Sequence, residues 1–386
     1  MKKVLVFIGS RANYASSKSL LIELKKNKKI NLIIVLAASA LSEKFGNLEK
    51  IIKNDGFSIK YRVFSLFEGE NHKAMTKTIG QTITDSVVVL EISNPDWVVV
   101  IGDRNEVLGF TICAAYMNFK IAHTMGGEVS GTIDESARHA ISKLSHLHFT
   151  ACSSATKRLK MMGENKKNII QSGCPRIDEV KKILRSKKPK IFDKEMINGV
   201  GKKFKIKKNK FILLSFHPVT TETLNYSNLE KILIYLAKLN INVVVLWPNS
   251  DAGSDQISKC YRSYREKKML ENFSFYKNLS FESYIYLMSK CLFLIGNSSS
   301  GVREGSFIGC KVINIGSRQN NRDIGDNLIH VKEPITKNKI SNACNKILKK
   351  RSIKKKFIYG KGNASKIIVN KILNSNINQQ KEWIEN

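Results

Sequence analysis

Short apolar runs alternate with helix-like segments along most of the chain. In the first half such runs lie at Val4–Ile8, Asn31–Ala37 and Trp97–Ile101, and a turn and a helical stretch follow each of them. The second half restarts the pattern at Phe211–Phe216 and continues it to Leu328–Val331. Strands that alternate with helices favour parallel sheets with helices on both faces. The sequence therefore predicts an α/β fold of two Rossmann-like, doubly wound domains that face a cleft, with ligands beyond the carboxyl ends of the strands.

The length of the chain and a charged central region predict the domain boundaries. A single core rarely grows beyond about 250–300 residues, and this chain has 386. Residues 178–209 are rich in lysine and poor in apolar side chains, as is typical of a connection between domains. We therefore expect an N-terminal domain over residues 1–177, a linker region over 178–209 and a C-terminal domain over 210–360.

The charge of the chain is strongly positive, with a formal net value of +33. Such a charge is compatible with a polyanionic partner. The lysines are dispersed, however, and aromatic side chains of the kind that stack on bases do not alternate with them. We therefore expect no nucleic-acid binding, and a positive field that draws in a small anionic substrate fits the composition better.

The sequence contains no apolar run near the roughly 20 residues that span a bilayer. The opening MKKVLVFIGS is too short for a signal peptide and lacks its cleavage site. A cytoplasmic protein without a membrane partner is therefore expected. The seven cysteines are scattered, without CxxC or the Cys/His grouping of zinc sites. The sequence thus predicts neither a disulfide nor a metal site, and it contains no cofactor motif.

Residues 125–149 place three acids, Glu128, Asp134 and Glu135, in a turn and at the start of a helix. The capping-box spacing from Thr132 to Glu135 predicts that the helix begins there. Three carboxylates this close indicate either a solvated capping turn or general acids and bases that face a cleft. The buried stripe of the helix is expected at Ala137, Ile141, Leu144 and His148.

Further candidates lie directly after expected strands. The segment Gly296–Gly301, GNSSSG, follows an apolar strand and precedes a helix. Its backbone amides could hold a phosphate, and a polar turn that caps the helix is the alternative. Arg11 follows the first strand, where an arginine can neutralise a pyrophosphate through paired hydrogen bonds. Arg318 and Arg322 could act likewise, and Glu304 could accept hydrogen bonds from sugar hydroxyls.

Asp103 and His217 also follow expected strands, so the cleft rule makes them candidates. Asp103 adds a fourth acid from a neighbouring strand, and His217 would face the acids across the cleft from the second domain. The remaining histidines are less distinctive. His123 and His139 could support the site through local hydrogen bonds, whereas His146 and His148 lie late in the predicted helix and suit packing or capping.

Six segments together resemble the UDP-N-acetylglucosamine 2-epimerase family, in particular its hydrolysing branch in sialic-acid and related nonulosonic-acid pathways. They occur in the family's order and cover most of residues 1–335. The segment at 126–149 is highly specific, and the others are weak individually. They are GSRANY at 9–14, VVVIGDRNEVL at 98–108, GGEVSGTIDESARHAISKLSHLHF at 126–149, FHPVTTET at 216–223, GNSSSGVREGSFIG at 296–309 and INIGSRQNNR at 313–322.

The resemblance implies a fold like that of the GT-B glycosyltransferases, with a C-terminal helix, here residues 365–386, that packs back on the first domain. It implies anti-elimination of UDP from UDP-N-acetylglucosamine, or from a UDP-diacetylbacillosamine-type sugar. Water would then add with inversion at C2 and release free N-acetylmannosamine or its analogue. The resemblance also implies a homodimer or homotetramer, and no cofactor is needed.

The resemblance also assigns roles to residues. Asp103, Glu128 and Asp134 fall on acid/base positions, with Glu135 adjacent, and His217 falls near the leaving phosphate. The nucleotide-binding positions fall on Arg11, Ser298, Ser299, Ser300, Gly301 and Glu304.

Two features depart from the family pattern. Asn13 stands where the family usually has an acid, and Ala37–Ala40 stands where it commonly has a Gly-x-His segment. Both positions bear on which sugar is accepted. A GT-B glycosyltransferase that uses a UDP-sugar, and a non-catalytic sugar-nucleotide-binding protein, are alternative interpretations of the sequence.

Overall fold

A computed structural model describes residues 1–45, 47–69, 71–130, 133–186, 188–219, 226–248, 253–277, 279–351 and 353–381. The chain divides into two compact units. The first unit comprises Met1–Val129, Ile133–Glu179 and the chain from Tyr359 onward, so the two ends of the chain share a unit. The second is formed mainly by Val180–Ile358.

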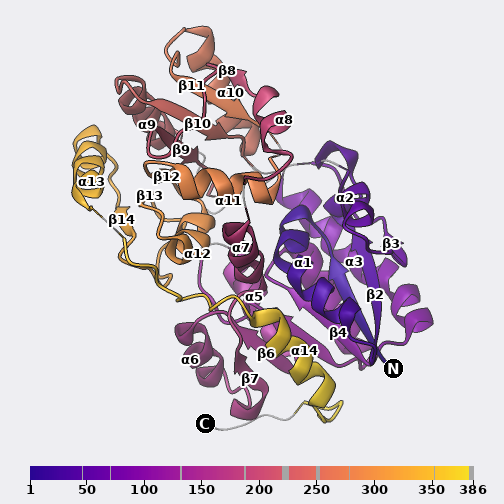
Figure 1. The fold of residues 1–386 in the computed structure, drawn as a ribbon. Coiled ribbons are helices and arrows are strands. Elements are labelled where there is room, and N and C mark those ends of the chain that lie inside the picture. Colours follow the sequence, from indigo (N-terminus) through magenta and orange to yellow (C-terminus); the bar gives the residue numbers. More distant parts are fainter. Residues whose placement is uncertain are drawn as a thin grey trace. The chain divides into compact units, whose positions relative to one another are not determined.

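The first unit is built on a seven-stranded sheet in which each strand is parallel to its neighbours. The strand order is β3-β2-β1-β4-β5-β6-β7, so the order reverses between β1 and β4. Figure 1 labels β2, β3, β4, β6 and β7 of this sheet. The strands are β1 Lys2–Ile8, β2 Ile30–Ala37, β3 Tyr61–Val63, β4 Trp97–Ile101, β5 Ile121–Thr124, β6 Leu147–Thr150 and β7 Ile169–Gln171.

Helices connect these strands and cover the sheet. α3, α4 and α5 pack side by side, and α1 packs against α14 near the end of the chain. The helices are α1 Arg11–Lys26, η1 Ala38–Ala40, η2 Glu43–Phe45, α2 Leu48–Asn54, α3 His72–Ser93, α4 Asn105–Tyr116, α5 Ile133–Leu144, α6 Ser153–Met161, η3 Lys166–Asn168, α7 Pro175–Arg185 and α14 Ala364–Asn374.

The core of the first unit explains why its strands read as unbroken apolar runs. β4 and β5 are buried along their whole length, as are strands of parallel sheets with both faces covered. Phe7 of β1 stacks on Phe110 of α4, with 4.2 Å between the ring centroids. This packing holds α4 against β1, and the loops that follow β1 and β4 therefore start from a well-packed core.

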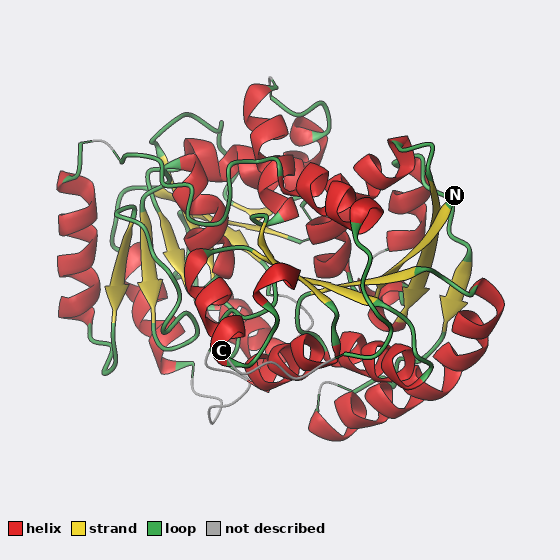
Figure 2. Ribbon diagram, turned by 90° about the horizontal axis from the view of Figure 1, so that it is seen from below, coloured by secondary structure: helices red, strands yellow, loops and turns green. Residues whose placement is uncertain are grey.

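The second unit repeats the architecture with the strand order β14-β13-β12-β9-β10-β11-β8. Its strands run parallel except β8, which is antiparallel to β11, and helices flank them (Figure 2). The order reverses between β9 and β12. The strands are β8 Val200–Gly201, β9 Phe211–Ser215, β10 Asn242–Leu246, β11 Phe273–Tyr276, β12 Leu294–Gly296, β13 Val312–Ile315 and β14 Leu328–Val331. The helices are α8 Phe192–Ile197, α9 Ser227–Ala237, α10 Ser254–Glu266, α11 Phe281–Lys290, α12 Ser299–Ile308 and α13 Lys337–Lys349.

The predicted α/β class with two Rossmann-like sheets is confirmed, and several local predictions need correction. The helix expected at 365–386 is α14, which ends at Asn374, and residues 382–386 lie outside the described part. The region 178–209 carries α8 and β8, of which β8 extends the second sheet. Within the described part of the chain, no helix has both the length and the apolar character needed to cross a bilayer.

Candidate functional site

In the first unit, candidate residues gather where the strand order reverses. Gly9, Ser10 and Arg11 follow β1, and Gly102 and Asp103 follow β4, the neighbouring strand. The carboxyl ends of such a strand pair are where ligands bind in open parallel sheets, because the connections leave the edge in opposite directions. Arg11 and Asp103 therefore emerge at the same edge although they are far apart in the sequence.

The loop after β1 is held by Asn13. Ser10 caps α1 by accepting a hydrogen bond from the Asn13 backbone amide (3.2 Å). The buried side-chain amide of Asn13 donates to the carbonyl of Ile101 at the end of β4 (2.9 Å). A carboxylate could not donate this bond. The departure at Asn13 therefore has a structural reason, since it joins the ends of β1 and β4.

A buried carboxylate that the sequence analysis did not single out lies beside the same loop. A Cβ at Gly9 would come within 2.2 Å of Glu106 Cγ, so only glycine fits there. Glu106 is in the first turn of α4 and pairs with Arg104 (Nε to Oε1, 2.9 Å). Its place near Asp103 in the sequence is the signal that could have identified it.

Arg138 organises the acids of this unit. Its side chain is almost wholly buried, and its guanidinium forms an ion pair with Asp103 Oδ2. The same guanidinium donates to the backbone carbonyl of Glu128 (2.7 Å). Arg138 lies on α5, four residues after Asp134, so one side chain joins the end of β4, the loop after β5 and the acidic helix.

The loop that carries Glu128 is shaped by Gly127. Its φ is +74°, and a Cβ there would come within 2.6 Å of the Ala155 carbonyl oxygen. The carbonyl of Gly127 accepts a hydrogen bond from Arg158. Glu128 itself is buried, with 3 % of its surface exposed. The loop therefore packs against α6, and Glu128 is buried in the first unit.

α5 begins at Ile133, as the capping pattern predicts, although Thr132 lies outside the described residues. Asp134 and Glu135 occupy its first turn and are half-buried. The predicted stripe is only partly right, because the buried side is formed by Arg138, Ile141 and Ser142. His148 belongs to β6, and His146 lies between α5 and β6, so the prediction that both are in the helix is wrong.

His123 on β5 supports the loop of Asp103. Its Nε2 lies 2.8 Å from the carbonyl of Gly102, and its Nδ1 lies 3.1 Å from the hydroxyl of Ser142 on α5. Burial lowers the pKa of His123 to about 3, so the ring is neutral near pH 7. Nε2–H therefore donates to Gly102, and His123 holds the backbone beside Asp103 without adding charge.

In the second unit, the reversal point between β9 and β12 is bridged by Asn297. Its side-chain oxygen accepts from the His217 amide (2.7 Å), and its side-chain nitrogen donates to the His217 carbonyl (2.8 Å). Gly296 has φ +140°, and a Cβ there would lie 1.9 Å from the Ser215 carbonyl oxygen. This close approach brings the buried His217 next to the start of α12.

The GNSSSG segment joins β12 to α12, and the helix begins within it, at Ser299, and not after it. Ser298 is the N-cap, and its hydroxyl lies 2.8 Å from that of Ser300, which also contacts the Tyr284 hydroxyl. Gly301 lets the helix pack on β13, because a Cβ there would come within 2.8 Å of Val312. Ser298 and Ser299 are half-buried at the helix end, and Glu304 is buried in the second turn.

The loop after β13 places Arg318 beside the same segment. Arg318 donates to the carbonyl of Asn297 (3.3 Å), as does the buried Gln319 (3.0 Å). Arg322 follows in the same loop and is half-buried. The second unit therefore gathers His217, a helix N-terminus and a cation from Arg318 at one edge of its sheet, a set suited to an anionic group.

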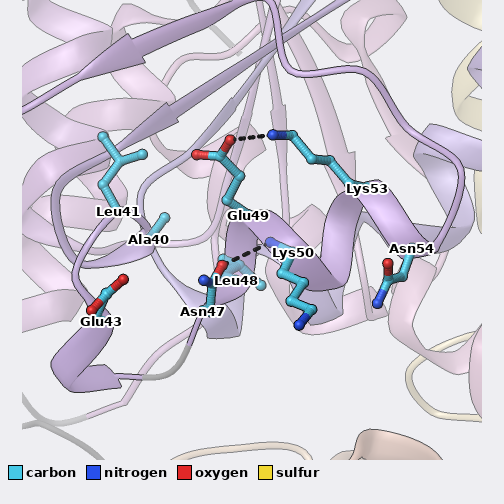
Figure 3. A pocket seen from close by; sticks show the side chains of 9 residues that line it. All are labelled: Ala40, Leu41, Glu43, Asn47, Leu48, Glu49, Lys50, Lys53 and Asn54. Atoms are coloured by element: carbon cyan, nitrogen blue, oxygen red, sulfur yellow. Dashed lines mark hydrogen bonds and ion pairs between the residues drawn. The ribbon is translucent and has the colours of Figure 1, made fainter.

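A cavity of about 330 Å³ lies in the first unit beyond β2 (Figure 3). It is lined by residues of η1, η2 and α2, including Ala40, Glu43 and Lys50, and by none of the candidate residues named above. The η1 loop is tied to the end of β1, because Ser39 Oγ and the Ala40 amide both donate to the Gly9 carbonyl (3.0 Å each). Among the described residues, no group of three or more His, Cys, Asp and Glu side chains could hold a metal ion.

The structure thus places Arg11 and Asp103 at the reversal point of the first sheet, and Arg138 joins the Glu128 loop to them. At the reversal point of the second sheet it places His217, Ser298 and Arg318. Arg138 and Asn297, which join members of these groups, were missed. Both lie inside segments that carry the family resemblance, and Arg138 is one helical turn beyond Asp134, which is the signal that could have marked it.

Comparison with known proteins identifies the family. Residues 22–373 match the family model described as UDP-N-acetylglucosamine 2-epimerase. A Legionella pneumophila protein named UDP-N,N'-diacetylbacillosamine 2-epimerase (hydrolyzing) is 33 % identical over 95 % of this chain and 94 % of its own. A Neisseria meningitidis UDP-N-acetylglucosamine 2-epimerase is 30 % identical over 86 % of this chain and 84 % of its own.

A solved structure has the same fold. The UDP-GlcNAc 2-epimerase of Methanocaldococcus jannaschii, in complex with UDP-GlcNAc and UDP, matches with a TM-score of 0.80. The match covers 97 % of this chain and 100 % of that one, at 16 % sequence identity. Together with the family model and the two relatives, this establishes that the chain belongs to the UDP-N-acetylglucosamine 2-epimerase family.

Proposed function

We propose that this protein is a hydrolysing 2-epimerase that converts a UDP-2-acetamido sugar and water into UDP and the free sugar with inverted C2. The substrate is UDP-N-acetylglucosamine or its diacetylbacillosamine analogue. One observation carries the proposal. Arg138 pairs with Asp103 and donates to the carbonyl of Glu128, and it lies on α5, whose first turn carries Asp134 and Glu135. The hydrolysing branch is supported by the name of the Legionella pneumophila relative.

The reaction has two steps, and each needs proton transfer. In the first, a carboxylate removes the C2 proton while the bond from C1 to the UDP oxygen breaks, which leaves a 2-acetamidoglycal. In the second step, the oxygen of water adds at C1, and a proton adds at C2 on the face opposite to the one from which the first proton was removed. The proton on C2, the carbon that carries the acetamido group, is only weakly acidic, so a well-placed base and a separate acid are both required. A group of several carboxylates can supply the two roles.

The first unit supplies these acids and bases. Asp103, Glu128, Asp134 and Glu135 are the candidates. The first helical turn favours an ionised carboxylate at Asp134 or Glu135, because the helix dipole is positive there. Arg138 gives Asp103 a fixed counter-charge and orientation. We assign Arg138 and His123 to positioning, because Arg138 pairs with Asp103 and donates to the Glu128 carbonyl, and His123 donates to the carbonyl of Gly102 beside Asp103.

The second unit supplies the stabilisation of the leaving group. Breaking the bond from C1 to UDP places negative charge on the pyrophosphate, which amide donors and cations stabilise. The N-terminus of α12 with Ser298 to Gly301, His217 and Arg318 form such a set. Arg322 provides a further cation, and Glu304 would accept hydrogen bonds from nucleotide hydroxyls.

The test is an NMR time course in D2O with UDP-N-acetylglucosamine and, separately, with UDP-diacetylbacillosamine. Release of UDP and of a free 2-acetamido sugar with deuterium at C2 supports the proposal, and the faster of the two substrates identifies the sugar. An epimerised sugar that keeps its UDP would place the protein in the non-hydrolysing branch. Turnover of neither substrate would contradict the proposal.

Two variants separate catalysis from binding. Asp103→Asn keeps the size of the side chain and removes its charge, so we expect turnover to fall about 100-fold or more while UDP binding is retained. Asp193→Asn, at an exposed position on α8, is the matched control and should leave both unchanged. If Asp103→Asn turns over normally, the assignment of Asp103 is wrong.

A further inference from the structure

The chain continues beyond α14 as a segment without helix or strand, residues 375–381, named here the C-terminal strap. At its end, Lys381 Nζ donates to the carbonyl of Lys143 (2.6 Å), 238 residues earlier, and lies 3.4 Å from the carbonyl of Ser142. Both carbonyls belong to the last turn of α5, where the amides of a continuing helix are missing. An ion pair with the buried Glu164 (2.6 Å) holds the ammonium in place. Lys381 is therefore a side-chain cap of α5 from a distant part of the sequence.

Two further contacts fix the strap beside this helix end. Burial lowers the pKa of His146, which follows α5, so its ring is neutral near pH 7. Its Nδ1 accepts from the Ile121 amide (3.1 Å), and its Nε2–H therefore donates to the carbonyl of Gln379 (2.8 Å). The side-chain amide of Gln379 donates to the carbonyl of Asn118 (2.8 Å). The strap is thus joined both to the end of α5 and to the start of β5.

α5 depends on polar contacts for its position. Of its 12 residues, all of which the structure describes, only Arg138, Ile141 and Ser142 are buried, and only Ile141 among these is apolar. Ala137 and Leu144 are half-buried. Helices in proteins gain most of their stability from a wide apolar face that packs on the core. Because α5 has only a narrow one, the cap at its end contributes more to its position than a cap usually does.

The same helix holds groups that the proposed reaction uses. Asp134 lies in its first turn, and Arg138 in the next turn pairs with Asp103. In the capped turn, Ser142 Oγ lies 3.1 Å from Nδ1 of His123, whose Nε2 holds the loop of Asp103. A displacement of the capped end therefore reaches Asp103 by two routes, one through each of these side chains.

We propose that Lys381 is a positioning residue of the reaction, which by capping α5 keeps Arg138 and Asp103 in the geometry that proton transfer needs. The inference rests on the proposed function. A displacement of about 1 Å at a reacting group costs up to about 100-fold in rate. Loss of the cap therefore lowers kcat, whereas KM changes little. A strap that only stabilises the fold would leave the kcat of folded molecules unchanged.

The test removes the ammonium and then restores it in the full-length chain. Lys381→Cys deletes it, and alkylation of the new thiol with 2-bromoethylamine forms a C–S bond, releases bromide and rebuilds a side chain that ends in an ammonium. All seven native cysteines are buried, so mass spectrometry should show one added group. Where circular dichroism shows native folding, kcat of Lys381→Cys should fall about 10-fold, with KM within about twofold of the wild type. Alkylation should restore most of kcat.

The matched control is Lys366→Cys, at an exposed position on α14. Its kcat should equal that of the wild type before and after alkylation. A Lys381→Cys variant with the kcat of the wild type overturns the proposal. So does a loss of kcat that alkylation does not restore, because the ammonium would then not be the group responsible.

Hydrogen exchange separates this inference from the proposed function. Amides in the second half of α5 should exchange about 10-fold faster in Lys381→Cys than in the wild type, and alkylation should reverse the change. Exchange in α3 should stay the same. Equal acceleration throughout the first unit, or none in α5, would show that Lys381 is not a cap of α5 and would overturn the inference. A wild type without turnover whose α5 responds as expected would contradict the proposed function and support the cap.

Discussion

The guanidinium of Arg138 forms an ion pair with the carboxylate of Asp103 while its second nitrogen donates to the carbonyl of Glu128 (2.7 Å). These three residues come from α5, the turn after β4 and the loop after β5. The relative positions of two candidate acids therefore depend on one buried side chain. The planar fork of arginine suits this task, because its nitrogens point to two acceptors at once.

Replacing Arg138 with lysine tests this geometry. Lysine keeps the positive charge but lacks the planar fork, so we expect Arg138→Lys to keep one contact and lose the other. Turnover should fall roughly 10- to 100-fold, with a smaller change in KM, and should fall further in Arg138→Met. Steady-state kinetics with the substrate identified by NMR measure the effect. Arg62→Lys, whose native partner is the partly exposed Glu49 in another part of the unit, is the control. Full activity in Arg138→Lys would contradict the positioning role.

The amide of Asn13 leads to a second prediction, at the position where the family usually has an acid. Asn13→Asp removes the donor to the Ile101 carbonyl and places a buried carboxylate against it. We expect a loss of about 1–3 kcal/mol in the free energy of unfolding at pH 8.

The pH dependence of that loss follows from the sign of the shift. Burial against a carbonyl raises the pKa of the introduced carboxyl above its unfolded value, so the folded state binds the proton more tightly. The destabilisation should therefore shrink as pH falls through the raised pKa, because a protonated carboxyl can donate to Ile101. Urea unfolding at pH 8 and pH 5 measures both values. A pH-independent loss would mean that the missing amide geometry, and not the charge, is responsible.

Periodicity and turn signals were sufficient to predict the two sheets. Continuous apolar runs such as Trp97–Ile101 become buried parallel strands because helices cover both faces, and the motif residues follow them at the carboxyl edge. No local sequence pattern predicts the strand order, which makes β1 and β4 neighbours. It determines that Arg11 and Asp103 emerge together.

Residues whose role comes from tertiary contacts escaped the sequence analysis. Arg138 lies on the inner side of α5, where a hydrophobic pattern predicts apolar residues, and its burial depends on Asp103 and the Glu128 loop. His148 continues the helical spacing of α5, yet α5 ends at Leu144 and β6 begins at Leu147. A pattern of four residues could not reveal that change of structure.

Gly296 provides a third prediction. Its φ is +140°, and a Cβ at this position would lie 1.9 Å from the Ser215 carbonyl oxygen, which leaves no room for alanine. We expect Gly296→Ala to separate β12 from β9, lower the melting temperature by several degrees and weaken UDP binding. Gly80→Ala is the control, because a Cβ there meets nothing within 4 Å and α3 should gain about 0.5–1 kcal/mol. Equal melting temperatures for the two variants would show that the loop at Gly296 can rearrange.

The C-terminal segment is joined to the first unit by a buried carboxylate, Glu164. Lys381 Nζ lies 2.6 Å from Glu164 Oε2 and 2.6 Å from the Lys143 carbonyl at the end of α5. Lys143 Nζ and His148 Nε2 also contact Glu164, at 3.0 Å and 2.8 Å. Burial alone would raise the pKa of Glu164, but the hydrogen bonds and charges of His148 and Lys381 lower it to about 2.

This lowered pKa predicts how Lys381→Met behaves with pH. A carboxyl whose folded pKa lies below its ordinary value of 4.5 contributes stability above that pH and loses it as pH falls toward 2. Lys381→Met should therefore cost roughly 1–3 kcal/mol of unfolding free energy at pH 7, and the gap to the wild type should narrow below pH 4.5. Urea unfolding from pH 7 to pH 3.5 measures this, with the exposed Lys366→Met as control. A gap that stays constant with pH would show that Lys381 stabilises the fold by packing or by its contact with the Lys143 carbonyl, and not through Glu164.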